Sequence, residues 1–282
     1  MSSFTINTIL EKTENRDKDF RYMATSDLLA ELCKDSFKPD TEGERRMVRS
    51  LLKLINDQSS DVQSLAVKCL SPLVRKVHEE KVDEVMLSLC NQVLSGTEEQ
   101  RDICSIGLKT VVLEMPSTMA ASAIRQLTPQ LIAGVQREQL EVKLECLEIL
   151  NDLLRRFAAS LAEAESRECL GALFAELQSS RAAARKRAIA CIASLSASLP
   201  DRMLEGQLVG AVLEQMMADG LKPELRRTYV QTVSAISRSG GYRLGNQLDR
   251  VVPLVLTQCM PAGVTDDAEM LEACLQVVSS AR

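Results

Sequence analysis

Nine cysteines and one histidine are the residues of this 282-residue chain that could act as nucleophiles or metal ligands. Zinc sites and disulfide frameworks use closely spaced cysteines, but here no two are closer than fourteen positions and no Cys-x-x-Cys motif occurs. We therefore expect neither a zinc site nor a disulfide framework. The cysteines are expected to be reduced thiols in an intracellular compartment. The cysteines are Cys33, Cys69, Cys90, Cys104, Cys146, Cys169, Cys191, Cys259 and Cys274.

The single histidine, His78, begins the charged run His-Glu-Glu-Lys at residues 78–81. Nucleophilic or metal catalysis needs convergent side chains, and no cysteine lies close to His78 in the sequence. We interpret His78 as a solvated helix end. The sequence predicts a protein that is not an enzyme, with no cofactor, no metal and no small-molecule substrate.

The most glycine-rich stretch is GGYRLG, residues 240–245. It lacks the Lys-Ser/Thr pair of a phosphate-binding loop and follows a predicted helix instead of a strand. We expect a helix end and a turn, with Gly240 at positive φ.

Basic residues gather in two nearby places, at Arg181, Arg185, Lys186 and Arg187, and then at Arg226, Arg227, Arg238 and Arg243. They could contact acidic partner residues or nucleic-acid phosphates, or they could be solvated helix starts and a ladder of Asp and Arg between repeats. The net charge of -5 and the lack of aromatic residues among the basic ones disfavour nucleic acid.

The composition favours helices, because hydrophobic residues make up 45% of the chain and aromatic residues only 3%. The N-terminus shows no basic segment followed by an apolar stretch, and no apolar run approaches the roughly 20 residues that span a bilayer. We expect a protein that is neither secreted nor membrane-bound, in the cytoplasm, the nucleus or both.

An internal repeat of about 40 residues determines the predicted architecture. The anchor positions of the repeat are Ala24, Ala66, Cys104, Cys146, Ala188, Tyr229 and Leu271. The residue four positions after the anchor is apolar in every repeat. The residue seven positions after the anchor is apolar in six repeats, and Glu31 is the exception. Positions i, i+4 and i+7 share one helix face, so each block predicts an amphipathic helix.

A second apolar helix precedes most of these stripe helices, which gives two helices per repeat. The predicted first helices are 44–55, 82–94, 120–135, 162–177, 203–217 and 247–258, and the second helices lie near 17–35, 59–77, 97–115, 139–157, 181–199, 222–239 and 266–282. The sequence thus predicts one all-α, armadillo-like HEAT-repeat superhelical solenoid of about seven helical pairs over residues 1–282.

Residues that favour helix starts, and small residues at the expected helix contacts, support this arrangement. Thr97 with Gln100 fits a capping box, Ser60 and Asp61 can cap the second stripe helix, and Pro223 suits a first helical turn. Cysteines at the anchor position or three residues after it, where Gly107 also falls, indicate tight internal sites.

Several longer runs resemble one known family, the cullin-associated and neddylation-dissociated proteins. The runs are 9–12 (ILEK), 17–28 (DKDFRYMATSDL), 34–37 (KDSF), 65–77 (LAVKCLSPLVRKV), 101–102, 105–111 (SIGLKTV), 146–150 (CLEIL), 185–187, 227–231, 235–238 and 241–245 (GYRLG). They run through the whole chain in order, and the first 115 residues carry the most specific part of the resemblance.

The resemblance implies a non-enzymatic scaffold. Such proteins are long HEAT solenoids that wrap around a cullin lacking the ubiquitin-like modifier NEDD8 and promote the exchange of substrate receptors on cullin-RING ubiquitin ligases. Their N-terminal repeats hold the cullin and its RING-box subunit, and their C-terminal repeats compete with the adaptor. Because family members are several times longer, we expect a fragment, a truncated gene product or half of a split protein, in which Leu271, Cys274, Leu275 and Val278 would face a further repeat.

The concave surface of such an array is lined mainly by second helices, whose polar starts are the expected protein-binding residues. They are Asp17, Lys18, Asp19, Arg21, Arg101, Asp102, Arg185, Lys186, Arg187, Arg226 and Arg227. Each could equally be a helix cap or an inter-repeat ion pair. Two other functions stay open, a generic HEAT adaptor of the nuclear-transport or phosphatase-scaffold type and a nucleic-acid-binding helical array.

Overall fold

The computed structural model describes residues 3–240, 243–244, 247–259 and 268–280. Within these ranges the chain forms α-helices and short turns of tighter or wider helix, and no strand. The predicted all-helical class is therefore confirmed. The chain divides into two compact units, Met1–Gly134 and Val135–Arg282. None of the helices in the described ranges is long and apolar enough to span a membrane.

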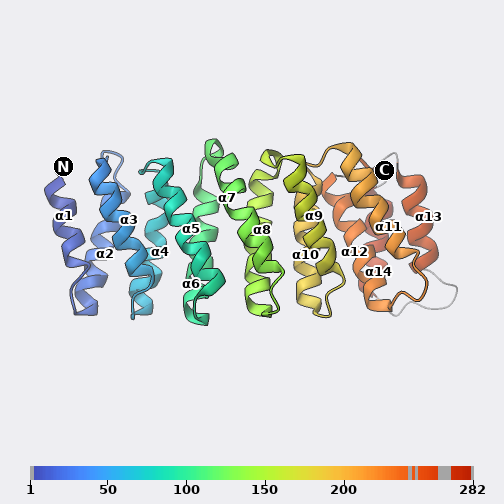
Figure 1. The fold of residues 1–282 in the computed structure, drawn as a ribbon, viewed down its shortest axis with the longest axis horizontal. Coiled ribbons are helices and arrows are strands. Elements are labelled where there is room, and N and C mark those ends of the chain that lie inside the picture. Colours follow the sequence, from blue (N-terminus) through green and yellow to red (C-terminus); the bar gives the residue numbers. More distant parts are fainter. Residues whose placement is uncertain (1–2, 241–242, 245–246, 260–267, 281–282) are drawn as a thin grey trace. The chain divides into compact units, whose positions relative to one another are not determined.

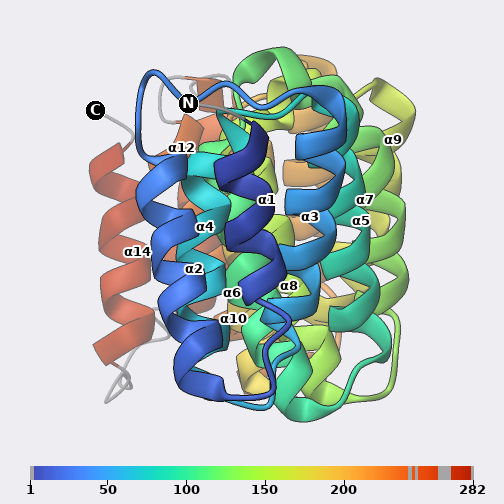
Figure 2. The same ribbon diagram turned by 90° about the vertical axis from the view of Figure 1, so that its left-hand side faces the viewer.

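The first unit consists of antiparallel helix pairs that stack side by side. Its helices are α1 (Ser3–Lys12), α2 (Lys18–Leu32), α3 (Thr41–Ile55), α4 (Ser60–Val74), α5 (Glu79–Ser95), α6 (Glu98–Glu114) and most of α7 (Ala120–Val135). The second helices α2, α4 and α6 pack on one another in one layer, and α1, α3 and α5 form the other layer (Figures 1 and 2). Helix α1 supplies the first helix of the first pair, which the sequence pattern left unassigned.

The second unit repeats the same arrangement. Its helices are α8 (Leu140–Phe157), α9 (Glu163–Leu177), α10 (Ala182–Ser196), α11 (Gly210–Met216), α12 (Pro223–Gly240), α13 (Leu248–Cys259) and α14 (Ala268–Ser280). Helices α8, α10, α12 and α14 pack successively, and α9, α11 and α13 pair with α10, α12 and α14. A π-helical segment, Met203–Val209, leads directly into α11, so the predicted helix 203–217 combines two kinds of helical turn.

The capping predictions are confirmed at two helix starts and wrong at one. Thr97 and Gln100 form the predicted capping box of α6, and α12 begins at Pro223. The cap of α4 is Ser59 and not Ser60 or Asp61, and its side chain makes no capping bond. The backbone of Ser59 is extended, so Ser60 already has helical geometry and its hydroxyl cannot reach back over the helix start.

The predicted tight internal sites are confirmed. Cys69, Cys104, Cys146, Cys191 and Cys274 are all buried. A Cβ atom added at Gly107 would lie 3.2 Å from a methyl group of Leu70 and 3.4 Å from one of Leu89, so a larger side chain on α6 would require these leucines to shift. The repeat therefore selects small residues for a packing reason.

One backbone prediction is wrong. Gly240 is the last residue of α12 and has no positive φ; among the described glycines only Gly220 does. Because α12 continues through Gly240, the helix end falls later than the glycine pattern predicted. Residues 241–242 and 245–246 of the GGYRLG stretch lie outside the described residues.

Candidate protein-binding surface

The polar starts of the second helices in the first unit divide into capping and exposed residues. Asp17 caps α2, and its carboxylate accepts a hydrogen bond of 2.9 Å from the Asp19 backbone N–H. Lys18 and Asp19 are exposed in the first turn of α2, and Asp102 is exposed near the start of α6. Three of the predicted binding residues therefore present their side chains to solvent.

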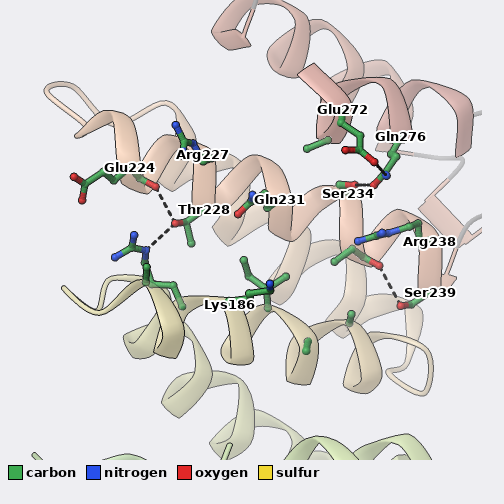
Figure 3. A pocket seen from close by; sticks show the side chains of 17 residues that line it. Lys186, Glu224, Arg227, Thr228, Gln231, Ser234, Arg238, Ser239, Glu272 and Gln276 are labelled. Atoms are coloured by element: carbon green, nitrogen blue, oxygen red, sulfur yellow. Dashed lines mark hydrogen bonds between the residues drawn. The ribbon is translucent and has the colours of Figure 1, made fainter. Parts of the chain in front are cut away.

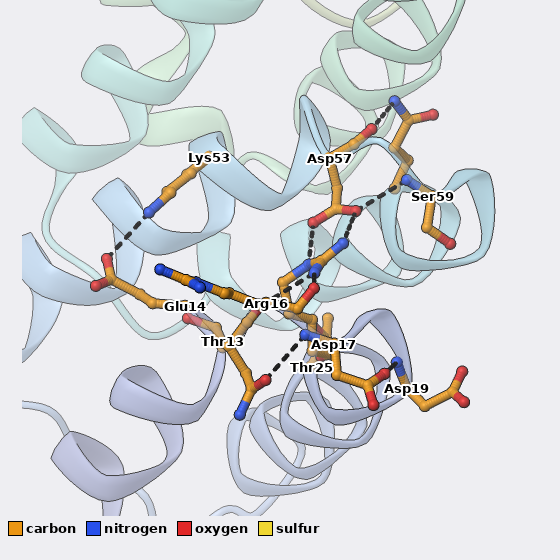
Figure 4. Close-up of polar contacts among 12 residues, drawn as sticks. Thr13, Glu14, Arg16, Asp17, Asp19, Thr25, Lys53, Asp57 and Ser59 are labelled. Carbon is orange, nitrogen blue, oxygen red and sulfur yellow. Dashed lines mark hydrogen bonds and ion pairs between the residues drawn. The ribbon is translucent and has the colours of Figure 1, made fainter.

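Arg21 is instead turned toward the neighbouring repeat. Its guanidinium donates to the Asp57 carboxylate at 2.6 and 2.8 Å, and to the carbonyl oxygens of Asn15 and Arg16 at 3.0 and 2.9 Å. The same carboxylate accepts a 2.9 Å hydrogen bond from the Ser59 backbone N–H, which places Asp57 at the centre of the cluster (Figure 4). This Arg–Asp pair joins α2 to the loop between α3 and α4.

The Arg21–Asp57 pair also sets the charge state of the carboxyl group. Burial acts to raise the pKa of Asp57, but the hydrogen bonds from Arg21 and Ser59 together lower it below the ordinary value of 3.8. The same side-chain hydrogen bond raises the pKa of Arg21. Both groups are therefore charged at neutral pH, and the contact is a true ion pair.

Arg21 belongs to a basic column that recurs three residues before the repeat anchor, at Arg21, Arg101, Lys143, Arg185 and Arg226. Lys143 of α8 pairs with the mostly buried Glu176 of α9 at 2.5 Å. Arg185 of α10 donates to Thr228 of α12 at 3.1 Å and to the Ser179 carbonyl at 2.8 Å. All five members are partly buried. Three of the five members, Arg21, Lys143 and Arg185, thus link successive helical pairs.

Two members of the column lack a complete set of partners. Arg101 makes one long hydrogen bond, 3.4 Å to the Gly96 carbonyl. The Nε atoms of Arg101 and Arg226 are buried and have no hydrogen-bond partner. These two atoms are therefore not accessible to a partner protein in this conformation.

The three residues of the basic run on α10 face two neighbouring helices and the solvent. Arg185 reaches α12, as above, and Arg187 donates to Glu148 of α8 at 2.7 Å. Lys186, between them, is exposed. Arg227 on α12 is exposed as well, whereas its neighbour Arg226 is half-buried. Lys186 and Arg227 are the two predicted residues that face solvent in the second unit.

These two residues lie in a groove that crosses α10, α12 and α14, which we call the α12 groove. Its volume is about 780 Å³, within the range of protein ligand sites. Small residues of α10, including Ala190 and Ala193, form one wall, and α14 forms the other (Figure 3). The described residues that line it are Ala182, Arg185, Lys186, Ile189, Ala190, Ala193, Glu224, Arg227, Thr228, Gln231, Ser234, Ala235, Arg238, Ser239, Glu272, Ala273 and Gln276.

Hydrogen bonds hold several of the side chains that line the groove in place. The Ser234 hydroxyl donates to the Gln276 side-chain oxygen at 2.8 Å, and the Gln276 amide donates to Glu272 at 3.2 Å, which ties α12 to α14. The Thr228 hydroxyl accepts from Arg185 and donates to the Glu224 carbonyl at 2.9 Å. Lys186 and Arg238 both line the groove and are exposed. The sequence pattern pointed to the cations but not to Gln231 and Ser234 of α12 or to Glu272 of α14.

The described part of the chain shows no cluster of metal ligands, and burial raises the pKa of several of its thiols. No group of three or more His, Cys, Asp or Glu residues there could hold a metal ion. Burial raises the pKa of Cys69 to about 12 and those of Cys90 and Cys104 to about 11, so these thiols stay protonated at neutral pH.

His78 is exposed at the start of α5, as predicted, but it has a partner that the sequence did not reveal. Its Nδ1 lies 2.7 Å from a carboxylate oxygen of Glu44, and its backbone N–H donates to the same carboxylate at 3.1 Å. Glu44 is only 2% exposed. The hydrogen bond to Glu44 raises the pKa of His78. The pair joins the start of α3 to the start of α5, and we interpret it as a structural contact.

Comparisons with known proteins agree with the repeat architecture. The family model described as "Stalled ribosome sensor GCN1-like, HEAT repeats" matches residues 2–115. A solved structure of Kap95p with RanGDP superposes with a TM-score of 0.67 at 14% identity, covering 100% of this chain and 36% of that one. A likeness at this identity shows the fold, and the HEAT-repeat class predicted from the sequence is confirmed.

Curated relatives match nearly the whole chain. It is 40% identical over 284 residues to Cullin-associated NEDD8-dissociated protein 1 of Arabidopsis thaliana, covering 99% of this chain and 23% of the relative. It is 43% identical over 278 residues to the protein of the same name in Drosophila melanogaster, covering 96% and 21%. A relative named "Cullin-associated NEDD8-dissociated protein 1, N-terminal part", from Emericella nidulans, is 26% identical, covering 89% and 83%. The chain thus spans about a quarter or less of the first two relatives.

Proposed function

Because this chain belongs to the family of the cullin-associated NEDD8-dissociated proteins, we propose that it is a non-enzymatic scaffold that binds a cullin lacking NEDD8, together with the RING-box subunit. The observation that carries the proposal is the identity of 40 to 43% over 96 to 99% of the chain with relatives named for cullin association. We place this activity in the cytoplasm, the nucleus or both, where reduced thiols are expected.

The exposed polar residues of the second helices are the proposed contacts. Asp19 and Asp102 face solvent in the first unit, and Lys186 and Arg227 do so in the second. Arg21, Arg185 and Arg187 already have partners in neighbouring repeats, so their role in binding would be to hold the repeats in register. Charged side chains around an interface affect its specificity and association rate more than its total affinity.

A pull-down with purified components tests the proposal. The chain is immobilised and offered a cullin–RING-box complex with and without covalently attached NEDD8. We expect retention of the unmodified complex and little retention of the modified one. Equal retention of both forms, or of neither, would contradict the proposal.

Charge reversal then locates the contacts. Asp19→Lys with Asp102→Lys should weaken cullin binding, because both side chains are exposed on second helices. Glu11→Lys with Glu80→Lys is the matched control, since it makes the same change of net charge on exposed positions of the first helices α1 and α5. If both double variants weaken binding equally, the effect comes from net charge and the second helices are not the contact surface.

A further inference from the structure

We propose that the α12 groove binds an acidic, amphipathic segment of a partner protein. The inference rests on the proposed function for one premise, that the second helices bind protein. It adds the charge and the apolar character of the partner segment that would bind to this part of the surface.

The charge of the lining favours an acidic segment. Among the described residues that line the groove, four are cations, Arg185, Lys186, Arg227 and Arg238, and two are carboxylates, Glu224 and Glu272, an excess of two positive charges. The chain as a whole has a net charge of -5, so this excess is local. A basic groove on an acidic protein attracts a partner segment of opposite charge and disfavours like-charged ones.

Two of these cations are available to a ligand. Lys186 on α10 and Arg238 on α12 are exposed, line the groove from different helices, and make no hydrogen bond or ion pair with another described residue (Figure 3). An arriving carboxylate would therefore not have to displace an existing partner of either side chain. Arg185, by contrast, is bound to Thr228 and Ser179.

The apolar part of the lining favours a segment that also carries small apolar side chains. Ala182, Ile189, Ala190 and Ala193 follow one side of α10, and Ala235 and Ala273 continue the apolar surface on α12 and α14. The alanines among them are short and let the backbone of a docked helix or strand come close, and Ile189 adds a larger apolar contact. Helix-in-groove recognition uses this combination of apolar contact in the groove and polar contact at its edges.

A nucleic acid fits the groove less well. None of the described residues that line it is aromatic, so these residues offer no surface for a base to stack on. The carboxylates of Glu224 and Glu272 would repel a continuous phosphate backbone, whereas the carboxylates of a protein segment can be spaced to avoid them.

The test uses the full chain and a fluorescein-labelled peptide of repeating Glu-Glu-Leu-Ala units, followed by fluorescence anisotropy at low salt. A peptide of Gln-Gln-Leu-Ala units is the neutral control. We expect the acidic peptide to bind, the neutral peptide to bind weakly or not at all, and the affinity to fall as salt is raised. Absence of binding by the acidic peptide, or equal binding of both peptides, would overturn the inference.

Two double variants locate the binding. Lys186→Glu with Arg238→Glu should weaken binding of the acidic peptide at least about tenfold, which corresponds to about 1.4 kcal/mol. Arg49→Glu with Arg125→Glu makes the same change of net charge on exposed positions of α3 and α7 and should change the affinity less than about twofold. Circular dichroism checks that both variants stay helical, and Lys186→Gln with Arg238→Gln repeats the test with a smaller change of charge. Equal weakening by the groove pair and the control pair would refute binding in the groove.

Two further measurements separate the alternatives. A single-stranded RNA that displaces the acidic peptide at lower concentration than unlabelled peptide would favour nucleic acid and overturn the inference. If the unaltered chain retains a cullin but no acidic peptide, the inference fails and the proposed function stands. If the peptide binds and no cullin is retained, the proposed function fails and the assignment of the groove to acidic segments is supported.

Discussion

Replacing Asp57 by Asn should loosen the first two helical pairs more than any exposed charge substitution nearby. The variant removes the charge that holds Arg21 through bonds of 2.6 and 2.8 Å, while Arg21 keeps its two bonds to backbone carbonyls. A hydrogen bond to a charged group contributes about 1.5–3 kcal/mol, and an exposed ion pair about 0–1 kcal/mol. The side chains of Arg21 and Asp57 are 15% and 9% exposed, and the Asn oxygen still accepts one bond. We therefore expect a loss of about 2 kcal/mol.

Hydrogen exchange followed by mass spectrometry is the suitable assay, because repeat proteins open locally and a single melting temperature averages over all repeats. The loss should appear as faster exchange in α1 to α4. Asp61→Asn is the control, since Asp61 is an exposed acidic residue in the first turn of α4, and it should change local stability by less than about 0.5 kcal/mol. If the two variants exchange alike, the pair does not hold these repeats together and the ladder argument is refuted.

The pH dependence gives the same prediction a second test. The folded-state pKa of Asp57 is lowered, so its contribution is fully present above the ordinary value of 3.8 and is lost as pH falls through the lower folded-state pKa. The difference in local stability between the unaltered chain and the Asp57→Asn variant should therefore be constant at neutral pH and shrink in acid. A difference that grows on acidification would contradict this account.

Two further predictions concern the histidine and the thiols. The pKa of His78 is raised by its bond to Glu44, so the stabilising effect of this pair should be present below pH 6.5 and fade as pH rises through the folded-state pKa. Thermal melts of the unaltered chain and of His78→Gln across this pH range test the prediction. A difference in melting temperature that does not change with pH would count against it. Mapping of N-ethylmaleimide adducts should show fast labelling of the exposed Cys33 and slow labelling of the buried Cys69 and Cys90; fast labelling of Cys69 in the folded chain would show that its site opens readily.

The packing of each repeat could be predicted from the sequence because it depends on local periodicity. Apolar residues at i, i+4 and i+7 located the stripe helices, and small residues marked close contacts such as that of Gly107 with Leu70. The partners of the basic column could not be predicted in the same way. Asp57 lies 36 positions after Arg21 and Glu176 lies 33 after Lys143, so no fixed spacing identifies the acceptor. The acceptors come from loops and helix ends, whose positions vary between repeats.

The run Arg185-Lys186-Arg187 shows why a cluster of charges in a sequence does not define a surface in such a fold. Successive residues of an α-helix point in directions roughly 100° apart. On α10 this rotation turns Arg185 toward Thr228 of α12, turns Arg187 toward Glu148 of α8, and leaves Lys186 exposed in the groove. Two of the three cations therefore join neighbouring repeats and the third is available to a partner. A solenoid needs both neighbours of every second helix to be held, so we expect the same division at other basic helix starts, and the exposed member is the residue to test for binding.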